Sequence, residues 1–308
     1  MRNIIEIKNL YKSYKDVKAV QDLSFCVKEG ELFAFLGVNG AGKSTTISMI
    51  CGTLAKDQGK IFINGKDIDT SLGEIKKDFG VVFQNSVLDK ALSVYDNLKY
   101  RASLYNIHGL EFEKRLNEVS EMLNLHNILK RSVGKLSGGQ VRRVDIARAI
   151  IHNPKILFLD EPTTGLDPHT RKNVWDVVSK LRRENNITVF LTTHYMEEAA
   201  DADYIVIIDQ GKIVASGTPL ELKNKYTVDY ISLYNVDEDK VNKLNYPYSK
   251  TRDGFKIKVK DPSEATSLIK NHSELFIDYE VTKGKMDDVF LNVTGKKLEG
   301  GAENGNSK

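Results

Sequence analysis

A glycine-rich loop between two apolar segments constrains this chain more than any other feature. It follows the apolar residues 32–36, precedes the helix-compatible residues 46–50, and reads Gly37-Val38-Asn39-Gly40-Ala41-Gly42-Lys43-Ser44-Thr45. The loop matches the phosphate-binding pattern G-x-x-x-x-G-K-[ST] between a strand and a helix. Glycines let backbone N–H groups close around a phosphate, and the helix N-terminus adds partial positive charge. We therefore predict a nucleotide site in which Lys43 reaches the β- and γ-phosphates and the Ser44 hydroxyl ligates Mg²⁺.

Composition places the chain in a broad class. Of its 308 residues, 28% are charged and 41% are hydrophobic, and the net charge is +3. These values are ordinary for a globular protein with one large and one smaller domain, and the net charge gives no argument for nucleic acid as a partner. No apolar run approaches roughly 18 residues and the first residues lack a signal-peptide core, which predicts a cytosolic chain. Cys26 and Cys51 cannot form a disulfide framework, so we expect them to pack as small hydrophobic residues.

The residues before the loop predict an antiparallel β-subdomain beside the nucleotide. Residues 5–10 favour an edge-type strand, and residues 17–20 and 23–27 favour two further strands. Tyr14 lies between the first and the second of these predicted strands. Its flat ring is suited to stack on a purine, or it packs on its neighbours as an ordinary strand tyrosine.

The segment after the first helix predicts two strands and then a helical region. Residues 59–66 favour a strand that ends in an Asn-Gly turn, a strong hairpin signal, and residues 79–84 favour a strand that ends on Gln84. Residues 92–131 carry apolar side chains at helical spacing. We expect an α-helical subdomain of about residues 85–150 with its own core.

A second informative stretch, Leu136-Ser137-Gly138-Gly139-Gln140, precedes a helix. Val141, Val144 and Ala147 fall on one face of that helix. A Ser-Gly-Gly cap at a helix N-terminus is a ready anion site, although the same residues also serve as a plain helix start.

Two carboxylates, Asp160 and Glu161, end the apolar strand predicted at residues 155–162. An aspartate that ends a buried parallel strand beside a phosphate loop is where the Mg²⁺-holding acid of P-loop NTPases lies. Asp160 would hold the metal, and Glu161 would face the γ-phosphate and polarise the attacking water. His194 follows the strand predicted at 187–192. A histidine at a strand end is usually incidental, but this one falls among phosphate-binding strand ends.

The chain changes character after residue 226. Short strand-like and polar helical segments then alternate, which predicts a small α+β domain over 227–295 without a catalytic constellation, and a disordered tail over 296–308. Residues 1–226 form the predicted nucleotide-binding domain. Residues 286–294 carry apolar side chains at helical spacing that must be buried, either on the same chain or on a second copy. Because every chemical motif precedes residue 195, we expect the second domain to be dispensable for nucleotide chemistry.

In their order, these motifs resemble the nucleotide-binding domain of ATP-binding cassette (ABC) transporters over roughly residues 3–225. Tyr14 matches the adenine-stacking A-loop, Gly37–Thr45 matches Walker A, and Gln84 matches the Q-loop. Leu136–Gln140 matches the ABC signature and Ile156–Glu161 matches Walker B, while Gly165-Leu166-Asp167 matches the D-loop and His194 the H-loop. The resemblance implies an α/β fold, a P-loop NTPase core with an antiparallel β-subdomain and an α-helical subdomain, followed by the small α+β domain.

The resemblance also implies a role for each matching residue. Implied nucleotide contacts are Tyr14, Gly37, Asn39, Gly40, Ala41, Gly42, Lys43, Ser44, Thr45 and Asp167, with Ser137 and Gly139 acting on the nucleotide of a second copy. Implied ligands of Mg²⁺ are Ser44, Gln84 and Asp160, and implied catalytic residues are Glu161, His194 and Gln84.

The resemblance implies that two copies of the chain enclose two ATP molecules between them. The signature of one copy would then meet the γ-phosphate at Lys43 of the other. Closure, hydrolysis at Glu161 and reopening would drive a separately encoded membrane permease from the cytoplasmic face of the membrane. Val133-Gly134-Lys135 and the ending 286–295 are similar to ATPase subunits of bacterial exporters of the daunorubicin/bacitracin-resistance type. That similarity implies export of drugs, antibiotics or similar amphipathic substrates.

Two other functions account for part of the sequence. A soluble ABC-type ATPase that acts on ribosomes or DNA would share the motifs. Ribosome-acting relatives, however, carry two cassettes in tandem and DNA-repair relatives a long coiled-coil insert, and this chain has neither. A P-loop kinase would explain residues 37–44 and Asp160 but would leave the signature and His194 without a role. None of the motifs names the transported substrate, because specificity lies in the membrane subunit.

Overall fold

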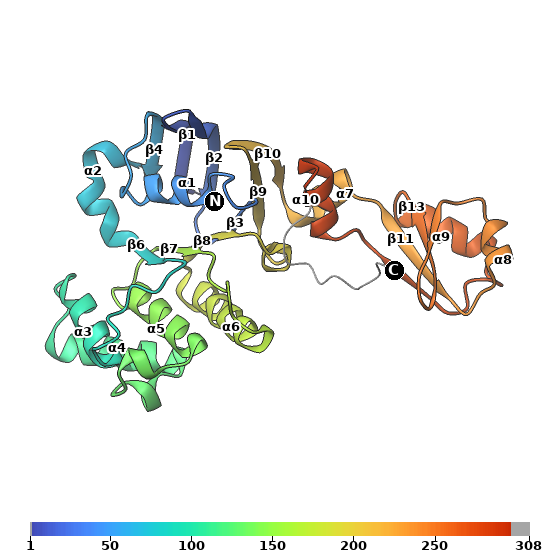
Figure 1. Cartoon of the computed structure of the whole chain (residues 1–308). Helices are drawn as coiled ribbons and strands as arrows, with labels where there is room; N and C mark the ends of the chain where they lie inside the picture. The colour runs from blue at the N-terminus through green and yellow to red at the C-terminus, as the bar shows by residue number, and fades with distance from the viewer. Residues whose placement is uncertain (1, 297–308) are drawn as a thin grey trace. The chain divides into compact units, whose positions relative to one another are not determined.

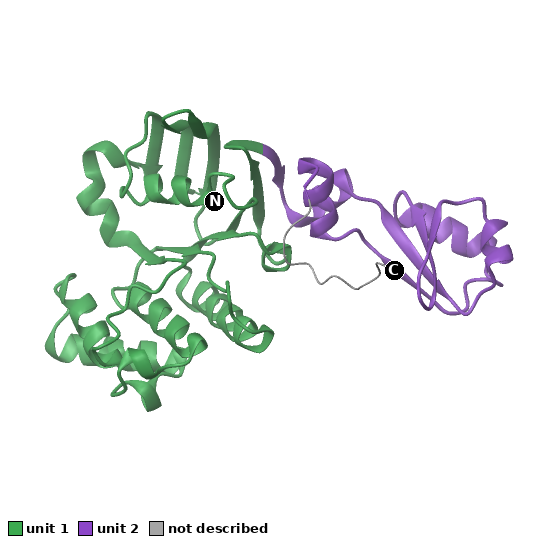
Figure 2. Cartoon of the chain, viewed as in Figure 1, with its two compact units in different colours: residues 1–213 green, residues 214–308 purple. Residues whose placement is uncertain are grey.

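The computed structural model describes residues 2–296 (Figure 1). The chain divides into two compact units, residues 1–213 and 214–308 (Figure 2). The division falls inside strand β10 (Lys212–Gly217), earlier than the boundary after Tyr226 that the sequence predicted. Helix α7 (Pro219–Tyr226) packs against helix α10 (Met286–Thr294), which assigns α7 to the second unit. From residue 297 on, the predicted tail lies outside the described residues.

An antiparallel sheet forms the N-terminal part of the first unit. Its strand order is β2-β1-β4-β5, with β1 (Asn3–Tyr14), β2 (Val17–Lys28), β4 (Gln58–Ile63) and β5 (Lys66–Asp67). Asn64 and Gly65 both have positive φ, 51° and 80°, as a two-residue hairpin turn requires, so the predicted hairpin is confirmed.

Two details of this sheet differ from the sequence prediction. The predicted edge strand, β1, is interior, because it pairs with β2 on one side and with β4 on the other. The two strands predicted at 17–20 and 23–27 form one continuous β2. Asp22 adopts a left-handed φ of 57° and accepts a hydrogen bond from Asn9 Nδ2 at 2.8 Å, so a bulge bends the strand without ending it.

A second sheet carries the motif-bearing strand ends. Its order is β10-β9-β3-β8-β7-β6, with β3 (Leu32–Leu36), β6 (Phe79–Val82), β7 (Ile156–Asp160), β8 (Thr188–Thr193) and β9 (Tyr204–Asp209). The pairs β3–β8, β3–β9, β6–β7 and β7–β8 are parallel, so these strands end at the same edge of the sheet. Every residue of β3, β7 and β8 is buried, as their apolar runs predict.

Helices cover this sheet on both faces (Figure 1). Helix α1 (Lys43–Ile50) and the antiparallel sheet lie on one face, where Phe33, Phe35, Phe158 and Phe190 join a common core. Helices α5 (Gly138–Ile150) and α6 (Pro168–Asn185) lie on the other face. The remaining helices of the unit are α2 (Ile68–Ile75), α3 (Val94–Ser103) and α4 (Gly109–Leu123), with short 3-10 turns at Lys76–Asp78, His126–Ile128, Val133–Lys135 and Met196–Ala199.

The predicted helical region is present, since α3 and α4 lie within residues 92–131 and both pack against α5. In residues 2–296, none of the helices is long and apolar enough to cross a membrane.

Besides α7 and α10, the second unit contains a four-stranded antiparallel sheet and the helices α8 and α9. In chain order these are β11 (Asp229–Tyr234), α8 (Glu238–Asn242), β12 (Tyr248–Lys250), β13 (Gly254–Val259), α9 (Pro262–Asn271) and β14 (Tyr279–Thr282). The strand order β12-β13-β11-β14 is that of a ferredoxin-like βαββαβ unit. The sequence prediction missed β12, because three residues are too few to show an alternating pattern.

Helix α10 completes the second unit. Met286, Val289 and Phe290 on its apolar face are buried, and Asn292 Nδ2 donates to the carbonyl oxygen of Tyr226 at 2.7 Å. Of the two alternatives that the sequence left open, burial on the same chain is therefore the one observed.

Candidate nucleotide site

The glycine-rich loop connects β3 to α1, as predicted. Gly40 and Gly42 adopt positive φ angles of 81° and 109°, which residues with a side chain rarely adopt. A Cβ at Gly42 would also collide with the carbonyl oxygen of Ala19 in β2. The turn between β9 and β10 also contacts the loop, because Gly211 N donates a hydrogen bond to Ala41 O at 3.0 Å. The loop is thus held in one shape by segments far away in the sequence.

Lys43, the first residue of α1, points back into the loop. Its side chain is 4% exposed, and Nζ donates to the carbonyl oxygen of Gly37 at 2.7 Å and to that of Val38 at 3.3 Å. Nζ also lies 3.2 Å from Glu161 Oε1. Burial lowers the pKa of Lys43, while the attraction of Glu161 opposes that shift. A cation is therefore held at the floor of the loop.

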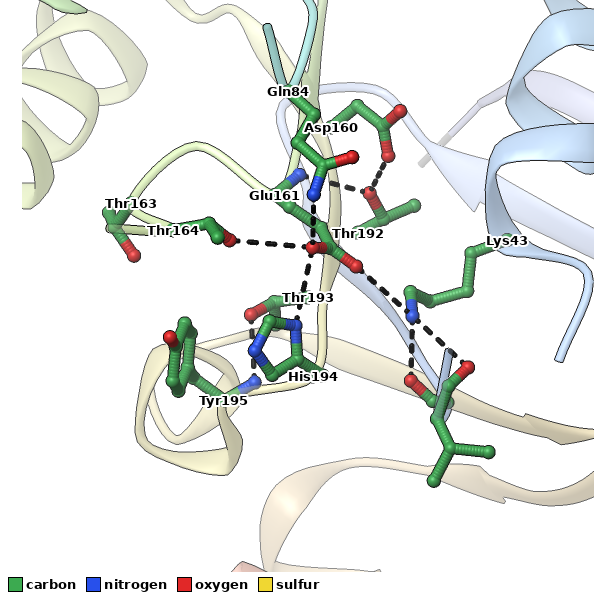
Figure 3. A network of polar contacts seen from close by, with 12 residues as sticks. Lys43, Gln84, Asp160, Glu161, Thr163, Thr164, Thr192, Thr193, His194 and Tyr195 are labelled. Atoms are coloured by element: carbon green, nitrogen blue, oxygen red, sulfur yellow. Dashed lines mark hydrogen bonds and ion pairs between the residues drawn. The ribbon is translucent and has the colours of Figure 1, made fainter. Parts of the chain in front are cut away.

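Two predicted catalytic residues from distant parts of the chain, Gln84 and His194, lie against the carboxylate of the third, Glu161 (Figure 3). Oε2 of Glu161 accepts a hydrogen bond from Gln84 Nε2 at 3.2 Å and lies 3.3 Å from His194 Nδ1. The Thr164 hydroxyl donates to the same oxygen at 3.4 Å. Glu161 is buried and has a left-handed φ of 47°, a conformation that non-glycine residues adopt at a cost of about 1–3 kcal/mol. The surrounding contacts hold the carboxylate in place despite that cost.

Asp160 lies at the buried end of β7, next to Ser44. Burial raises the pKa of Asp160, and a hydrogen bond from the Thr192 hydroxyl to Oδ1, at 2.5 Å, opposes the shift. The nearby Ser44 hydroxyl also opposes the rise in the pKa of Asp160. Thr192 was not among the residues predicted from the sequence. The sequence shows only that a hydroxyl residue ends an apolar run, whereas the structure pairs Thr192 directly with Asp160 between β8 and β7.

A cavity of 690 Å³ opens above the loop. It is lined by Asp16, Val17, Lys18, Ala19, Gln21, Asn39, Gly40, Gly42, Lys43, Ser44, Thr45, Gln84, Glu161 and Gln210. Most of the predicted phosphate-binding residues therefore share one wall with Gln84 and Glu161. Tyr14 ends β1 two residues before Asp16, is 46% exposed, and does not line the cavity itself.

Ser137, Gly139 and Asp167 lie in a different place from the loop of the same chain. Ser137 caps α5, and Gly139 is packed so closely on Thr170 that a Cβ would collide with that side chain. Asp167 caps α6, where Oδ1 accepts from Thr170 N at 3.0 Å. Ser137, Gly139 and Thr170 line a separate hollow of 540 Å³. The signature and the D-loop thus meet each other at Thr170 rather than at Lys43.

Comparisons with known sequences agree with this geometry. Residues 20–164 match the family model described as ABC transporter. The linearmycin resistance ATP-binding protein LnrL of Bacillus subtilis (strain 168) is 34% identical over 311 residues, which cover 96% of this chain and 99% of that protein. The probable multidrug ABC transporter ATP-binding protein YbhF of Escherichia coli (strain K12) is 39% identical over 220 residues. That match covers 71% of this chain but only 38% of the length of YbhF.

A solved structure gives the same result for the fold. The dimeric ATP-binding cassette MJ0796, in a post-hydrolysis state bound to ADP and Pi, matches with a TM-score of 0.64 and 30% identity, covering 70% of this chain and 98% of that one. The predicted α/β P-loop core is confirmed. This chain therefore belongs to the ATP-binding proteins of ABC transporters and is similar to those of multidrug and linearmycin-resistance systems.

Proposed function

We propose that this chain binds ATP in the cavity above Gly37–Thr45 and hydrolyses it as the ATPase subunit of an ABC exporter. One observation carries the proposal: the Glu161 carboxylate is fixed among Lys43, Gln84 and His194 at the wall of that cavity. A general base acts only from a position within hydrogen-bond reach of the proton it takes. Glu161 lines the cavity beside Lys43, so its carboxylate would face a water that attacks a γ-phosphate bound there.

Each residue of the site has a part in this reaction. The loop amides and Lys43 bind the β- and γ-phosphates, and Tyr14 stacks on the adenine. Glu161 takes a proton from the water that attacks the γ-phosphorus. His194, 3.3 Å from Oε2, holds the carboxylate in the orientation that this transfer needs. The close packing around Glu161 keeps the carboxylate from rotating away from the cavity.

Ser44, Gln84 and Asp160 fit the requirements of Mg²⁺. The hydroxyl of Ser44 and the carboxylate of Asp160 lie next to each other, and both offer oxygen ligands. Mg²⁺ prefers oxygen ligands and is usually held by one or two carboxylates or hydroxyls together with substrate phosphates. When bound, it neutralises charge on the β- and γ-phosphates. A cation at this site would favour the ionised form of Asp160 and so offset the burial that raises its pKa.

The second half of the site would come from another copy of the chain. Ser137 and Gly139 lie at the N-terminus of α5, whose backbone N–H groups form an anion site. They line a hollow separate from the loop of the same chain, so the γ-phosphate they bind would belong to the partner copy. The dimeric state of the MJ0796 cassette supports this arrangement.

Closure of two copies over ATP, followed by hydrolysis and reopening, would move a separate membrane permease on the cytoplasmic side of the membrane. The similarity to LnrL, a linearmycin resistance protein, and to YbhF, a probable multidrug transporter protein, supports export of drugs or similar amphipathic compounds. Because the chain spans only 38% of YbhF but 99% of LnrL, the similarity to LnrL carries more weight.

Steady-state hydrolysis of Mg-ATP tests the proposal. The wild-type chain should release phosphate, and Glu161→Gln should lower kcat by about 10²-fold or more, the scale of a general base. Glu113→Gln is the matched control, because Glu113 accepts from the hydroxyl of Tyr95, away from the cavity. Equal rates for the wild type and Glu161→Gln would contradict the proposal. Co-purification of the chain with a multi-span membrane protein would test the transport role.

A further inference from the structure

Arg142, in the helix that follows the signature, contacts the backbone of the candidate site beside Gln84 and at Glu161. It is the fifth residue after the Ser137 cap and only 6% exposed. Its guanidinium Nη1 donates to the carbonyl oxygen of Phe83 at 2.6 Å, and Nη2 donates to that of Glu161 at 3.1 Å. Nε donates to the carbonyl oxygen of Pro162. One planar side chain therefore joins the residue before Gln84 to the peptide that carries the catalytic carboxylate.

Asp145 lies one turn further along the same face of α5 and is 5% exposed. Its Oδ1 accepts a hydrogen bond from the Ser86 hydroxyl at 2.9 Å, and the carboxylate also accepts one from the backbone N–H of Val87. Arg142 and Asp145 thus hold the Q-loop on both sides of Gln84. Because their charges are opposite and close, each offsets part of the cost of burying the other.

The conformation of Glu161 explains why such a support is needed. Its left-handed φ of 47° is unfavourable for a residue with a side chain and persists only where the surroundings determine it. Two of the three Arg142 hydrogen bonds end on this peptide and the next one, at Glu161 and Pro162. The planar fork of a guanidinium can bond several fixed acceptors at once, which the point charge of lysine cannot do.

We infer that Arg142, supported by Asp145, is a positioning residue that links the signature helix to Gln84 and Glu161 of the same chain. This inference rests on the proposed ATPase function. The signature helix would then make two contacts. Ser137 would contact the ATP of the partner copy, and Arg142 contacts the peptides next to Gln84 and at Glu161 in its own chain. A shift of α5 when two copies close therefore moves the Gln84 amide and the Glu161 carboxylate together.

The test compares Arg142→Lys with Arg115→Lys. Arg115 also donates to backbone carbonyls of the α5 segment, at Ile150 and Ile151, but at the end away from the site. We expect Arg142→Lys to lower kcat by roughly 10- to 100-fold, the scale of a small misplacement of reacting groups, with the Kd for ATP changed by less than about twofold. Arg115→Lys should retain the wild-type kcat.

Other values of kcat and Kd for Arg142→Lys would decide against the inference. A kcat of Arg142→Lys within about twofold of the wild type, or a Kd that rises in parallel with the loss of kcat, would overturn the inference. Should Arg142→Lys not fold, Ser86→Ala decides, because it removes only the hydroxyl that bonds Asp145. We expect a kcat about fivefold lower for Ser86→Ala, the scale of one hydrogen bond, and an unchanged kcat would count against the linkage. A wild-type protein without activity would contradict the proposed function itself and the inference with it.

Discussion

Nζ of Lys43 lies 3.2 Å from Oε1 of Glu161, and the two side chains are 4% and 8% exposed. The phosphate-loop cation and the proposed catalytic carboxylate thus form a buried pair within one cavity. Glu161 favours the charged form of Lys43, whose burial alone would disfavour it. A nucleotide phosphate competes with Glu161 for Lys43, so on this account ATP binding frees the carboxylate to act on water.

Lys43→Ala should abolish ATP binding. The change removes a cation that makes charge-assisted hydrogen bonds to phosphate, worth about 3 kcal/mol or more in total, which raises the Kd at least 100-fold. Titration calorimetry with Mg-ATP measures this effect. Lys66→Ala is the control, since Lys66 pairs with Glu74 outside the cavity. An unchanged Kd for Lys43→Ala would rule out the phosphate-loop assignment.

Tyr14→Ala should weaken ATP binding by about 1–3 kcal/mol, the scale of aromatic stacking on a base. Tyr14→Phe should have almost no effect, because the ring face and not the hydroxyl stacks. Tyr14 is 46% exposed, so its ring is accessible. The Kd values of both variants decide the role. Equal losses for both, or no loss for either, would favour an ordinary strand tyrosine.

His152 should make the fold sensitive to acid. Its ring stacks on Tyr105 with centroids 3.8 Å apart, and Nε2 lies 2.9 Å from the carbonyl oxygen of Phe79. Because a carbonyl only accepts, Nε2 carries the hydrogen, and a second proton must go to Nδ1. Within the described residues, Nδ1 is buried and has no hydrogen-bond partner. Burial lowers the pKa of His152 from 6.5 to about 4, and the hydrogen bond to Phe79 opposes the shift.

The sign of the effect follows from this lowered pKa. The unfolded chain accepts a proton that the folded chain resists, so the stability contributed by neutral His152 is complete above pH 6.5 and is lost as the pH falls toward 4. The loss is at most about 3 kcal/mol, and less where water reaches the ring. Urea unfolding gives the free energy of unfolding at about pH 7.5 and at about pH 5. Between these pH values it should fall less for His152→Gln, which keeps a donor for the carbonyl of Phe79, than for the wild type. Identical decreases for the variant and the wild type would exclude His152 as the cause.

Phe290→Ala should loosen the second unit without affecting nucleotide binding. Phe290 is fully buried in α10, and loss of such a side chain costs about 3–5 kcal/mol. Hydrogen exchange in α7 and α10 should accelerate, while the Kd for ATP should stay the same, since all residues that line the cavity precede Ile213. Leu291→Ala is the control, because Leu291 is 36% exposed. A large rise in the Kd for Phe290→Ala would show that the second unit takes part in nucleotide chemistry.

Local signals were enough to predict most of the strand-and-loop framework. Apolar runs followed by polar residues predicted the buried strands β3, β7 and β8, which lead into the phosphate loop, Asp160 and His194. In a parallel sheet such ends share one edge, so their proximity could also be expected. The Asn64-Gly65 turn was equally local, since both residues tolerate positive φ.

Contacts between distant segments could not be predicted in this way. Nothing near Arg142 in the sequence indicates that its guanidinium binds the carbonyl of Phe83, and nothing near Thr192 indicates a bond to Asp160. These contacts depend on how α5 and β8 lie against other elements. The bulge at Asp22 was missed for a related reason, because the pattern of apolar residues breaks there while the pairing with β1 continues.

In the proposed cycle two copies close over ATP, and hydrolysis at Glu161 then allows them to separate. Size-exclusion chromatography with light scattering, on Glu161→Gln with and without Mg-ATP, measures this closure. The variant should elute as a monomer without nucleotide and as a dimer with ATP, because the closed state cannot hydrolyse its ATP and reopen. Adding Ser137→Arg, which fills the anion site at the N-terminus of α5, should return the ATP-bound sample to monomer. A Glu161→Gln protein that binds ATP and stays monomeric would contradict the account.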